Sequence, residues 1–368
     1  MQRLALAAHP FETVPAGETE QIQKIANLMV QLLDQRYQGQ PRILRGVHPK
    51  AHGCAHASFQ VDADLPAEFR VGLFSAPGAA YSAEVRFSNA AALVGPDVDD
   101  SQGVANRKHG SRGMAIKVRG VSAPVFEADE PNTQDFLMVN LPVFPFANVA
   151  DYLELTIAQL AGKDVPAAFL PAFGQALVKL PGGPARLGKV QQISAAIAKT
   201  PVSSPLESSY FSASPFLFGP ERVMKFSVVP VDNKTTPLAD PLDKDYLRKV
   251  LVEQLKAKAC QFDFLVQVQT PRDELLIEDV TFNWDPAKYP FKKVARLTIP
   301  QQDLDCASSI EACEQLFFTP WHSLLDHRPL GGINRLRREV YLASANHRRY
   351  LPETSGGGVT RRRRRRRW

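Results

Sequence analysis

The chain contains four short apolar segments between Ile43 and Val143: Ala57-Ser-Phe-Gln-Val61, Ala83-Glu-Val-Arg-Phe87, Gly113-Met-Ala-Ile-Lys-Val118 and Asp135-Phe-Leu-Met-Val139. The residues between them include glycine, proline and asparagine, which favour turns. Short apolar runs punctuated in this way are typical of antiparallel strands. Further strands are expected at 222–231, 260–270 and 293–299.

Helical periodicity occupies the rest of the chain. The first amphipathic helix is expected at Thr19–Gln38, where apolar residues recur every three or four positions. Further helices are expected at Val149–Gln159, Pro166–Leu180, Ala185–Lys199, Asp245–Lys258 and, in a helical final third, Gly332–Leu351. Strands and helices in separate runs predict an α+β protein.

Charge is distributed unevenly along the 368 residues. The 44 lysines and arginines exceed the 38 acidic residues by six, but seven arginines lie at 361–367, so the rest carries a net charge of −1. The folded part therefore lacks the basic excess of a specific nucleic-acid-binding domain. We interpret 355–368 as a flexible tail; the alternative is that its arginines contact an anionic surface such as RNA, a membrane or an acidic protein.

The sequence has no apolar run of the roughly 18–20 residues that a membrane helix needs. Its first residues are too short for the apolar core of a secretory signal. The four cysteines lack the spacing of a zinc site, and we interpret them as buried free thiols of a reducing compartment. They are Cys54, Cys260, Cys306 and Cys313. These observations predict a cytoplasmic location.

Three histidines, His48, His52 and His56, follow one another at intervals of four, as metal ligands on one helical face would. Pro49 and Gly53 disfavour a helix there, so we interpret the segment as a loop and the start of a strand, with zinc as the alternative. Dinucleotide, Walker A, serine-hydrolase and zinc-protease motifs are absent from the sequence.

The last expected helix places Arg337, Tyr341 and Arg348 within roughly 40° of one another around its axis. A guanidinium one turn away favours phenolate over phenol. Phenolate is a ligand for ferric haem iron. The alternative interpretation is an exposed basic helix with an ordinary tyrosine, because the same segment contains further arginines.

Six segments together resemble the haem catalases and their shorter relatives, in the same order along the chain. They are Arg45-Gly-Val-His-Pro-Lys50, Val85-Arg-Phe-Ser88, Arg112-Gly-Met-Ala-Ile-Lys117, Asp135-Phe-Leu-Met-Val-Asn-Leu-Pro142, Trp284 with Tyr289-Pro290 and Val294–Ile299, and Arg337-Arg-Glu-Val-Tyr341 with His347-Arg348. The resemblance spans about residues 42–349. It implies a single domain at 1–354, built as a closed antiparallel β-barrel with flanking helices, with haem b between the barrel and the late helix.

The resemblance also implies a role for each matching residue. His48 would be the distal acid–base residue, backed by Ser88, and Tyr341 would be the proximal ligand of ferric iron, with Arg337 stabilising its phenolate. An imidazole with the ordinary pKa near 6.5 would accept and return the peroxide proton. The haem contacts would further include Arg45, Arg86 and Arg348 at the propionates and Tyr152 over the distal face.

Departures from the catalase pattern point to the small members of the group, which include bacterial peroxidases and allene oxide synthases. The chain is much shorter than a full catalase. Where catalases have the catalytic asparagine, this sequence has Val139, and Asn140 matches the next position. Either Asn140 donates a hydrogen bond to peroxide, or Val139 makes the pocket more apolar.

The resulting hypothesis is a haem peroxidase (EC 1.11.1.-) that consumes hydrogen peroxide or organic hydroperoxides. One alternative is a fatty acid hydroperoxide isomerase or dehydratase of the allene oxide synthase type. Another is a non-catalytic haem- or lipid-binding barrel, and a fourth hypothesis gives the basic tail the central role at a nucleic acid or membrane surface. A homo-oligomer is compatible with all four.

Overall fold

The computed structural model describes residues 7–103, 106–127, 129–238, 240–270 and 277–350. The tail expected at 355–368 lies outside these residues. Among the helices described, none is long and apolar enough to cross a membrane.

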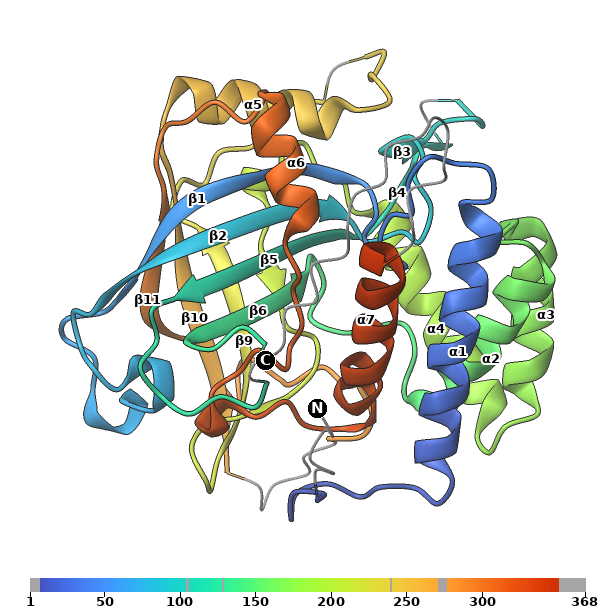
Figure 1. Ribbon diagram of the computed structural model, residues 1–368, viewed down its shortest axis with the longest axis horizontal. Coiled ribbons are helices and arrows are strands. Elements are labelled where there is room, and N and C mark those ends of the chain that lie inside the picture. The colour runs from blue at the N-terminus through green and yellow to red at the C-terminus, as the bar shows by residue number, and fades with distance from the viewer. Residues whose placement is uncertain (1–6, 104–105, 128, 239, 271–276, 351–368) are drawn as a thin grey trace, which may run out of the picture.

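Eight antiparallel strands form a closed barrel, as predicted (Figure 1). Around the barrel they are β1 (Ala51–Val61), β2 (Ala80–Asn89), β5 (Arg112–Arg119), β6 (Thr133–Val139), β7 (Tyr210–Phe211), β9 (Val223–Pro230), β10 (Cys260–Gln269) and β11 (Lys292–Ile299). Pairing of β9 with β10 closes the ring, so these strands leave no open edge. The short strand β8 (Phe216–Leu217) pairs antiparallel with one end of β9, and β3 (Val98–Asp99) pairs with β4 (Lys108–His109) apart from the barrel.

Aromatic side chains fill the barrel. The ring centroid of Phe136 lies 4.7 Å from that of Phe264 and 4.9 Å from that of Phe226, and Phe59 lies 5.2 Å from Phe264. All four side chains are buried. The interior is therefore a packed core rather than a channel, and a ligand has to bind at the barrel's periphery.

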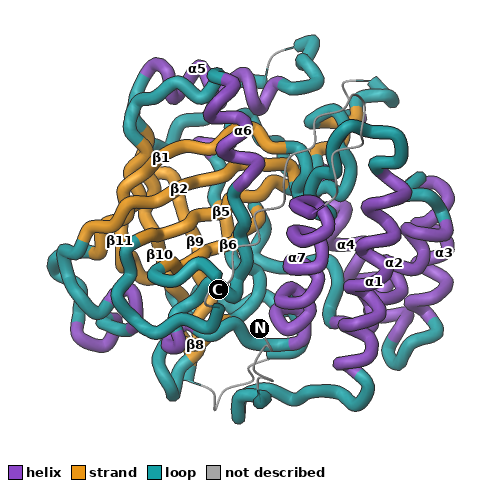
Figure 2. Tube along the Cα trace, viewed as in Figure 1, coloured by secondary structure: helices purple, strands orange, loops and turns teal. Residues whose placement is uncertain are grey.

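Helices cover one side and one end of the barrel. Their bounds are α1 (Glu18–Arg36), α2 (Val149–Ala161), α3 (Pro166–Val178), α4 (Gly183–Lys199), α5 (Tyr246–Ala257), α6 (Ala307–Gln315) and α7 (Gly332–Tyr350). Figure 2 shows α1, α2, α3, α4 and α7 gathered beside the strands. Helix α7 lies between the barrel and α1, and the buried apolar side chains of α1, α2 and α7 form one cluster.

The cysteine interpretation is wrong. Cys54 on β1 and Cys313 on α6 form a disulfide across 259 residues of sequence. Of the remaining two, Cys260 is half-buried and Cys306 is exposed. The four residues therefore give no argument for a reducing compartment, and the cytoplasmic location stays a prediction.

The histidine triplet has the loop-and-strand arrangement that we favoured. His48 lies in a loop, and both His52 and His56 lie on β1. His52 Nε2 is 3.0 Å from Asn89 Oδ1, and no group of three or more metal-binding side chains is found in the described parts of the chain.

A buried ion network links β5 and β6 to the loop before α7. Lys117 Nζ lies 2.8 Å from Asp135 Oδ1, and His322 lies 2.9 Å from Asp135 and 3.2 Å from Asp129. Burial disfavours the imidazolium of His322, but the two carboxylates outweigh this effect and raise its pKa to about 9. The protonated form therefore stabilises the fold.

We expect the free energy of unfolding to fall as the pH rises from 6.5 through 9. The stabilisation is fully present below the unfolded-state pKa near 6.5 and is lost above the folded-state value, a change of roughly 3 kcal/mol. Denaturant titrations of the wild type and His322→Gln at several pH values measure this slope. His56→Gln, an exposed control on β1, should retain it; an unchanged slope in His322→Gln would contradict the assignment.

Candidate functional site

Two adjoining cavities lie where the barrel meets α7. The arginine cavity is bordered by Arg45, Arg86 and Arg348 and encloses about 830 Å³, counting space open to solvent. The apolar cavity encloses about 1160 Å³ on the same basis and is bordered by side chains such as Phe146 and Ile197. The two share a wall made by Val47, His48, Val139, Phe144, Arg337, Val340 and Tyr341.

His48 is positioned on this wall by its loop, which is strained, and by two residues of β2. Its φ of 55° lies in the left-handed region, which is uncommon for a residue with a side chain and is often found at functional sites. Its Nδ1 is 2.9 Å from Ser88 Oγ, and its carbonyl oxygen accepts a hydrogen bond from Arg86. The predicted pairing of His48 with Ser88 is present.

The imidazole of His48 differs from our expectation in its protonation. Burial, followed by the charges of Arg86, Arg337 and Arg45, lowers its pKa to about 3. The expectation of an ordinary value near 6.5 is therefore wrong. His48 is neutral at physiological pH and available as a base.

Arg337 and Tyr341 lie one turn apart on α7 and line both cavities. Arg337 Nε donates to Tyr341 Oη at 3.3 Å, and Arg337 is only 7% exposed. Asn334 Oδ1, at 3.1 Å from Arg337 Nη1, helps to fix the guanidinium. The helical spacing read from the sequence thus gives a phenol and a buried cation in contact.

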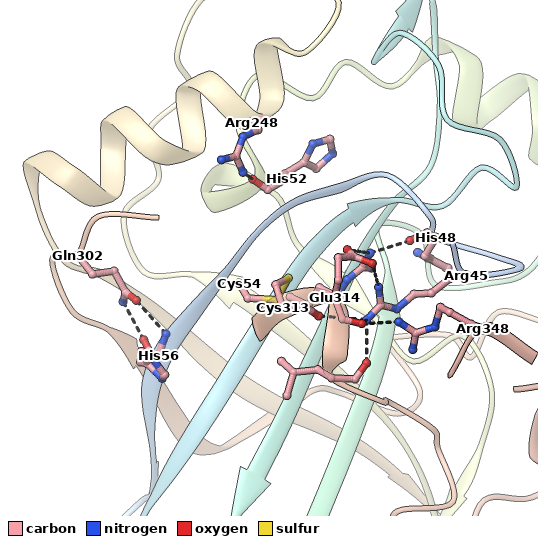
Figure 3. Close-up of a disulfide and its surroundings, with 12 residues drawn as sticks. Arg45, His48, His52, Cys54, His56, Arg248, Gln302, Cys313, Glu314 and Arg348 are labelled. Atoms are coloured by element: carbon pink, nitrogen blue, oxygen red, sulfur yellow. Dashed lines mark hydrogen bonds and ion pairs between the residues drawn. A yellow bond between two sulfur atoms is a disulfide. The ribbon is translucent and has the colours of Figure 1, made fainter. Parts of the chain in front are cut away.

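Arg45, Arg86 and Arg348 all lie against Glu314, a residue that no sequence motif marks: Arg45 and Arg86 face its carboxylate, and Arg348 donates to its backbone carbonyl. Figure 3 shows Arg45 and Arg348 at Glu314. Glu314 Oε2 accepts a hydrogen bond from Arg45 at 2.6 Å, and Glu314 Oε1 lies 3.8 Å from Arg86. Burial, together with the other guanidiniums, lowers the pKa of Arg86 well below its ordinary value and that of Arg348 to about 9. We call these three arginines and Glu314 the arginine cluster; its three cations face one internal anion.

Asn140 is not brought to the site. Its Oδ1 accepts hydrogen bonds from Ser111 Oγ at 3.0 Å and from the Arg112 backbone N–H at 2.7 Å. Val139 lines both cavities instead. The wall beside His48 therefore carries the isopropyl group of Val139. Of the two expectations, this is the more apolar pocket rather than the one with the Asn140 amide.

Tyr152, on α2, lines the apolar cavity together with Tyr341. Burial, followed by the proximity of Tyr341, raises the pKa of Tyr152 to about 12. Its phenol is protonated, so Tyr152 can contribute an aromatic surface and a hydroxyl but no anionic ligand.

Comparison with solved structures identifies the architecture. Over 94–95% of its length the chain matches a fungal catalase, catalase A from Saccharomyces cerevisiae and a bacterial catalase, with TM-scores of 0.63, 0.63 and 0.62. The chain has the catalase fold. Sequence identities are 14%, 15% and 17%, and the match covers 65%, 67% and 64% of those chains, about two thirds of their length. No family model and no curated protein sequence matches the chain.

Within this catalase fold, Gly113 on β5 makes room for His48. A β-carbon at Gly113 would lie 2.4 Å from His48 Nδ1 and 2.9 Å from Ser88 Oγ. Since these distances are shorter than van der Waals contact, any side chain there would have to displace the imidazole.

We expect Gly113→Ala to separate His48 from Ser88 and to destabilise the protein by about 1–3 kcal/mol. A crystal structure would show the displaced ring, and denaturant unfolding would measure the loss. Gly188→Ala in α4 is the control, because no atom lies within 4 Å of its added methyl group. Undisturbed His48–Ser88 geometry in Gly113→Ala would refute this packing argument.

Proposed function

We propose that the chain is a haem-dependent enzyme that consumes hydroperoxides. The observation that carries this proposal is the common cavity wall on which the Arg337–Tyr341 pair and the neutral His48 lie, with Ser88 beside His48 and the arginine cluster next to them. The catalase fold is consistent with this chemistry, and each group of residues at the site fits one part of it.

The charge of the arginine cluster fits a dicarboxylate. Three guanidiniums and the Glu314 carboxylate leave two positive charges, and haem b carries two propionates. Arg86 Nε and Arg348 Nε are buried and have no hydrogen-bond partner among the described residues. A carboxylate that accepted bonds from them would remove this cost.

The rest of the cavity suits a porphyrin and its metal. Apolar side chains, including Met114, Phe317 and Val340, line the arginine cavity. The Tyr341 oxygen would hold ferric iron, and Arg337 would donate a hydrogen bond to that oxygen. Bound haem would supply the redox-active iron that peroxide reduction requires.

His48 would move the peroxide proton. In the tautomer that donates Nδ1–H to Ser88, the free Nε2 can accept a proton from a hydroperoxide and return it to the leaving oxygen. The hydrogen bond from Arg86 to the His48 carbonyl holds the loop in place during both transfers. The low pKa keeps the base unprotonated before substrate arrives.

The apolar cavity favours organic hydroperoxides over hydrogen peroxide. Val139 offers no hydrogen bond to a second peroxide oxygen, and the adjoining wall is largely hydrocarbon, with Leu141, Val143 and Ile197. Transfer of an alkyl or acyl chain from water into this cavity would be favourable. The same cavity supports a second candidate, isomerisation or dehydration of a fatty acid hydroperoxide.

We expect Val139→Asn to shift the preference toward hydrogen peroxide. The amide would supply a hydrogen bond worth about 1–1.5 kcal/mol, or about tenfold, in relative kcat/KM. Cumene hydroperoxide and hydrogen peroxide, assayed in parallel with haem-loaded protein, give this ratio. Val178→Asn, an exposed position on α3 that lines neither cavity, is the control and should keep the wild-type ratio. Equal ratios in the wild type and Val139→Asn would count against our interpretation of the wall.

The proposed function itself is tested with His48→Gln. This variant should bind haem but lose peroxide turnover by about 10²–10⁴-fold, the usual contribution of a positioned acid–base group. In the wild type, His48 should impose no acidic loss of kcat/KM near pH 6.5, because its neutral form persists down to about pH 3. Haem binding with no peroxide or lipid hydroperoxide turnover in the wild type would leave a binding protein and refute the proposal.

A further inference from the structure

The C-terminal end of α6 accepts hydrogen bonds from the guanidinium of Arg45. Arg45 Nη1 donates to Glu314 Oε2 at 2.6 Å, while Nη2 donates to the carbonyl oxygens of Cys313 at 3.1 Å and Leu316 at 2.8 Å. Both terminal nitrogens of the guanidinium are thus engaged by one short segment of chain (Figure 3). The arginine that the catalase resemblance assigned to a propionate is already bound to the protein itself.

Helix α6 presents negative charge to the cluster in two ways. The last carbonyl groups of a helix have no partner within it and carry the negative end of its dipole. Arg348 donates to one of them, the carbonyl of Glu314, and Arg349 donates to that of Gln315. Together with the internal anion, the Glu314 carboxylate, these carbonyls give the end of α6 a negative electrostatic potential.

The Cys54–Cys313 disulfide fixes this end of the helix. Cys313 directly precedes Glu314, and Cys54 is opposite Arg86 in the pairing of β1 with β2. The bond therefore ties the internal anion to the strand pair that carries a second arginine of the cluster. Cys313 is also the buried residue of α6, at 4% exposure, whereas the helix otherwise lies on the surface.

We propose that reduction and oxidation of this disulfide control whether Arg45 is available to a ligand at the carboxylate-binding site, and we call the disulfide the latch. When it is closed, α6 engages Arg45, and Arg86 and Arg348 remain to bind a ligand. When it is open, the end of α6 can leave, and Arg45 becomes available to a ligand carboxylate. The identification of that ligand as haem rests on the proposed function; the coupling between the disulfide and Arg45 does not.

The redox chemistry of the latch balances with two simple reactants. A dithiol reductant supplies two electrons and two protons, so the S–S bond breaks, two cysteine thiols form and the reductant becomes a cyclic disulfide. In the reverse direction a hydroperoxide ROOH oxidises one thiol to a sulfenic acid and leaves as ROH. The second thiol then displaces water from that sulfenic acid and restores the disulfide.

Titration with haemin, followed by absorbance, tests the latch in the full-length protein. We expect Cys54→Ser/Cys313→Ser to bind haemin about tenfold more tightly than the wild type, the effect of one additional charged hydrogen bond. Cys260→Ser/Cys306→Ser retains the disulfide and should match the wild type. Haemin dimethyl ester, which has no free carboxylates, should show no difference between the two double variants.

A second pair of variants leaves the disulfide intact. Glu314→Gln removes the internal carboxylate and should also tighten haemin binding. Glu311 lies one turn earlier on α6 and pairs with the exposed Arg42. Glu311→Gln is therefore the control and should leave haemin affinity unchanged. Equal haemin affinity in Glu314→Gln and Glu311→Gln would overturn the role of Glu314.

Amide hydrogen exchange separates failure of the latch from failure of the proposed function. Treatment of the wild type with a dithiol should accelerate exchange across residues 307–316, whether or not haemin binds. Faster exchange without haemin binding would retain the latch and refute the haem proposal. Unchanged exchange, or equal haemin affinity with the disulfide closed and open, would overturn the latch.

Discussion

Burial of several guanidiniums at one place is the constraint on which the rest of the site depends. Arg45, Arg86 and Arg348 border one cavity, and each has a lowered pKa because burial and neighbouring positive charges disfavour its cationic form. Buried charges of one sign are stable only when anions or hydrogen-bond acceptors compensate them. Glu314 and the end of α6 provide part of this compensation, which leaves a site suited to an anionic ligand.

The fold brings these charges together from distant segments through the regular geometry of strands and helices. Arg86 and Ser88 are two residues apart on β2, so both point to the same face, one toward the cluster and the other to His48. Helix α7 carries Arg337 and Tyr341 one turn apart on the adjoining wall. Pairing of β2 with β5 then places Gly113 opposite Ser88, which leaves space for the imidazole.

Much of this arrangement could be predicted from the sequence because it depends on local periodicity. The strands at 83–87 and 113–118, and the helix that carries Tyr341, follow from the spacing of apolar residues. Closure of the barrel follows from no local pattern, since β9 and β10 pair across a connection that contains α5. It entered the prediction through the ordered catalase-like segments.

Other features depend on contacts that no local pattern encodes. The orientation of Val139 and Asn140 depends on where β6 ends, and a shift of one residue exchanges the two sides of a strand. The Cys54–Cys313 bond joins segments 259 residues apart, so the spacing of cysteines gave no signal for it. Glu314 stands beside Cys313 in sequence, but only the folded chain places it against Arg45.

The proposal that Tyr341 would hold haem iron is tested most directly by an absorption spectrum of the protein after haemin has been added. With Tyr341 as ligand, the ferric wild type should show phenolate-to-iron charge transfer. This spectrum should disappear in Tyr341→Phe and persist in Tyr81→Phe, a control on β2 that lines neither of the two cavities. Identical spectra and haem affinities for all three proteins would contradict the account.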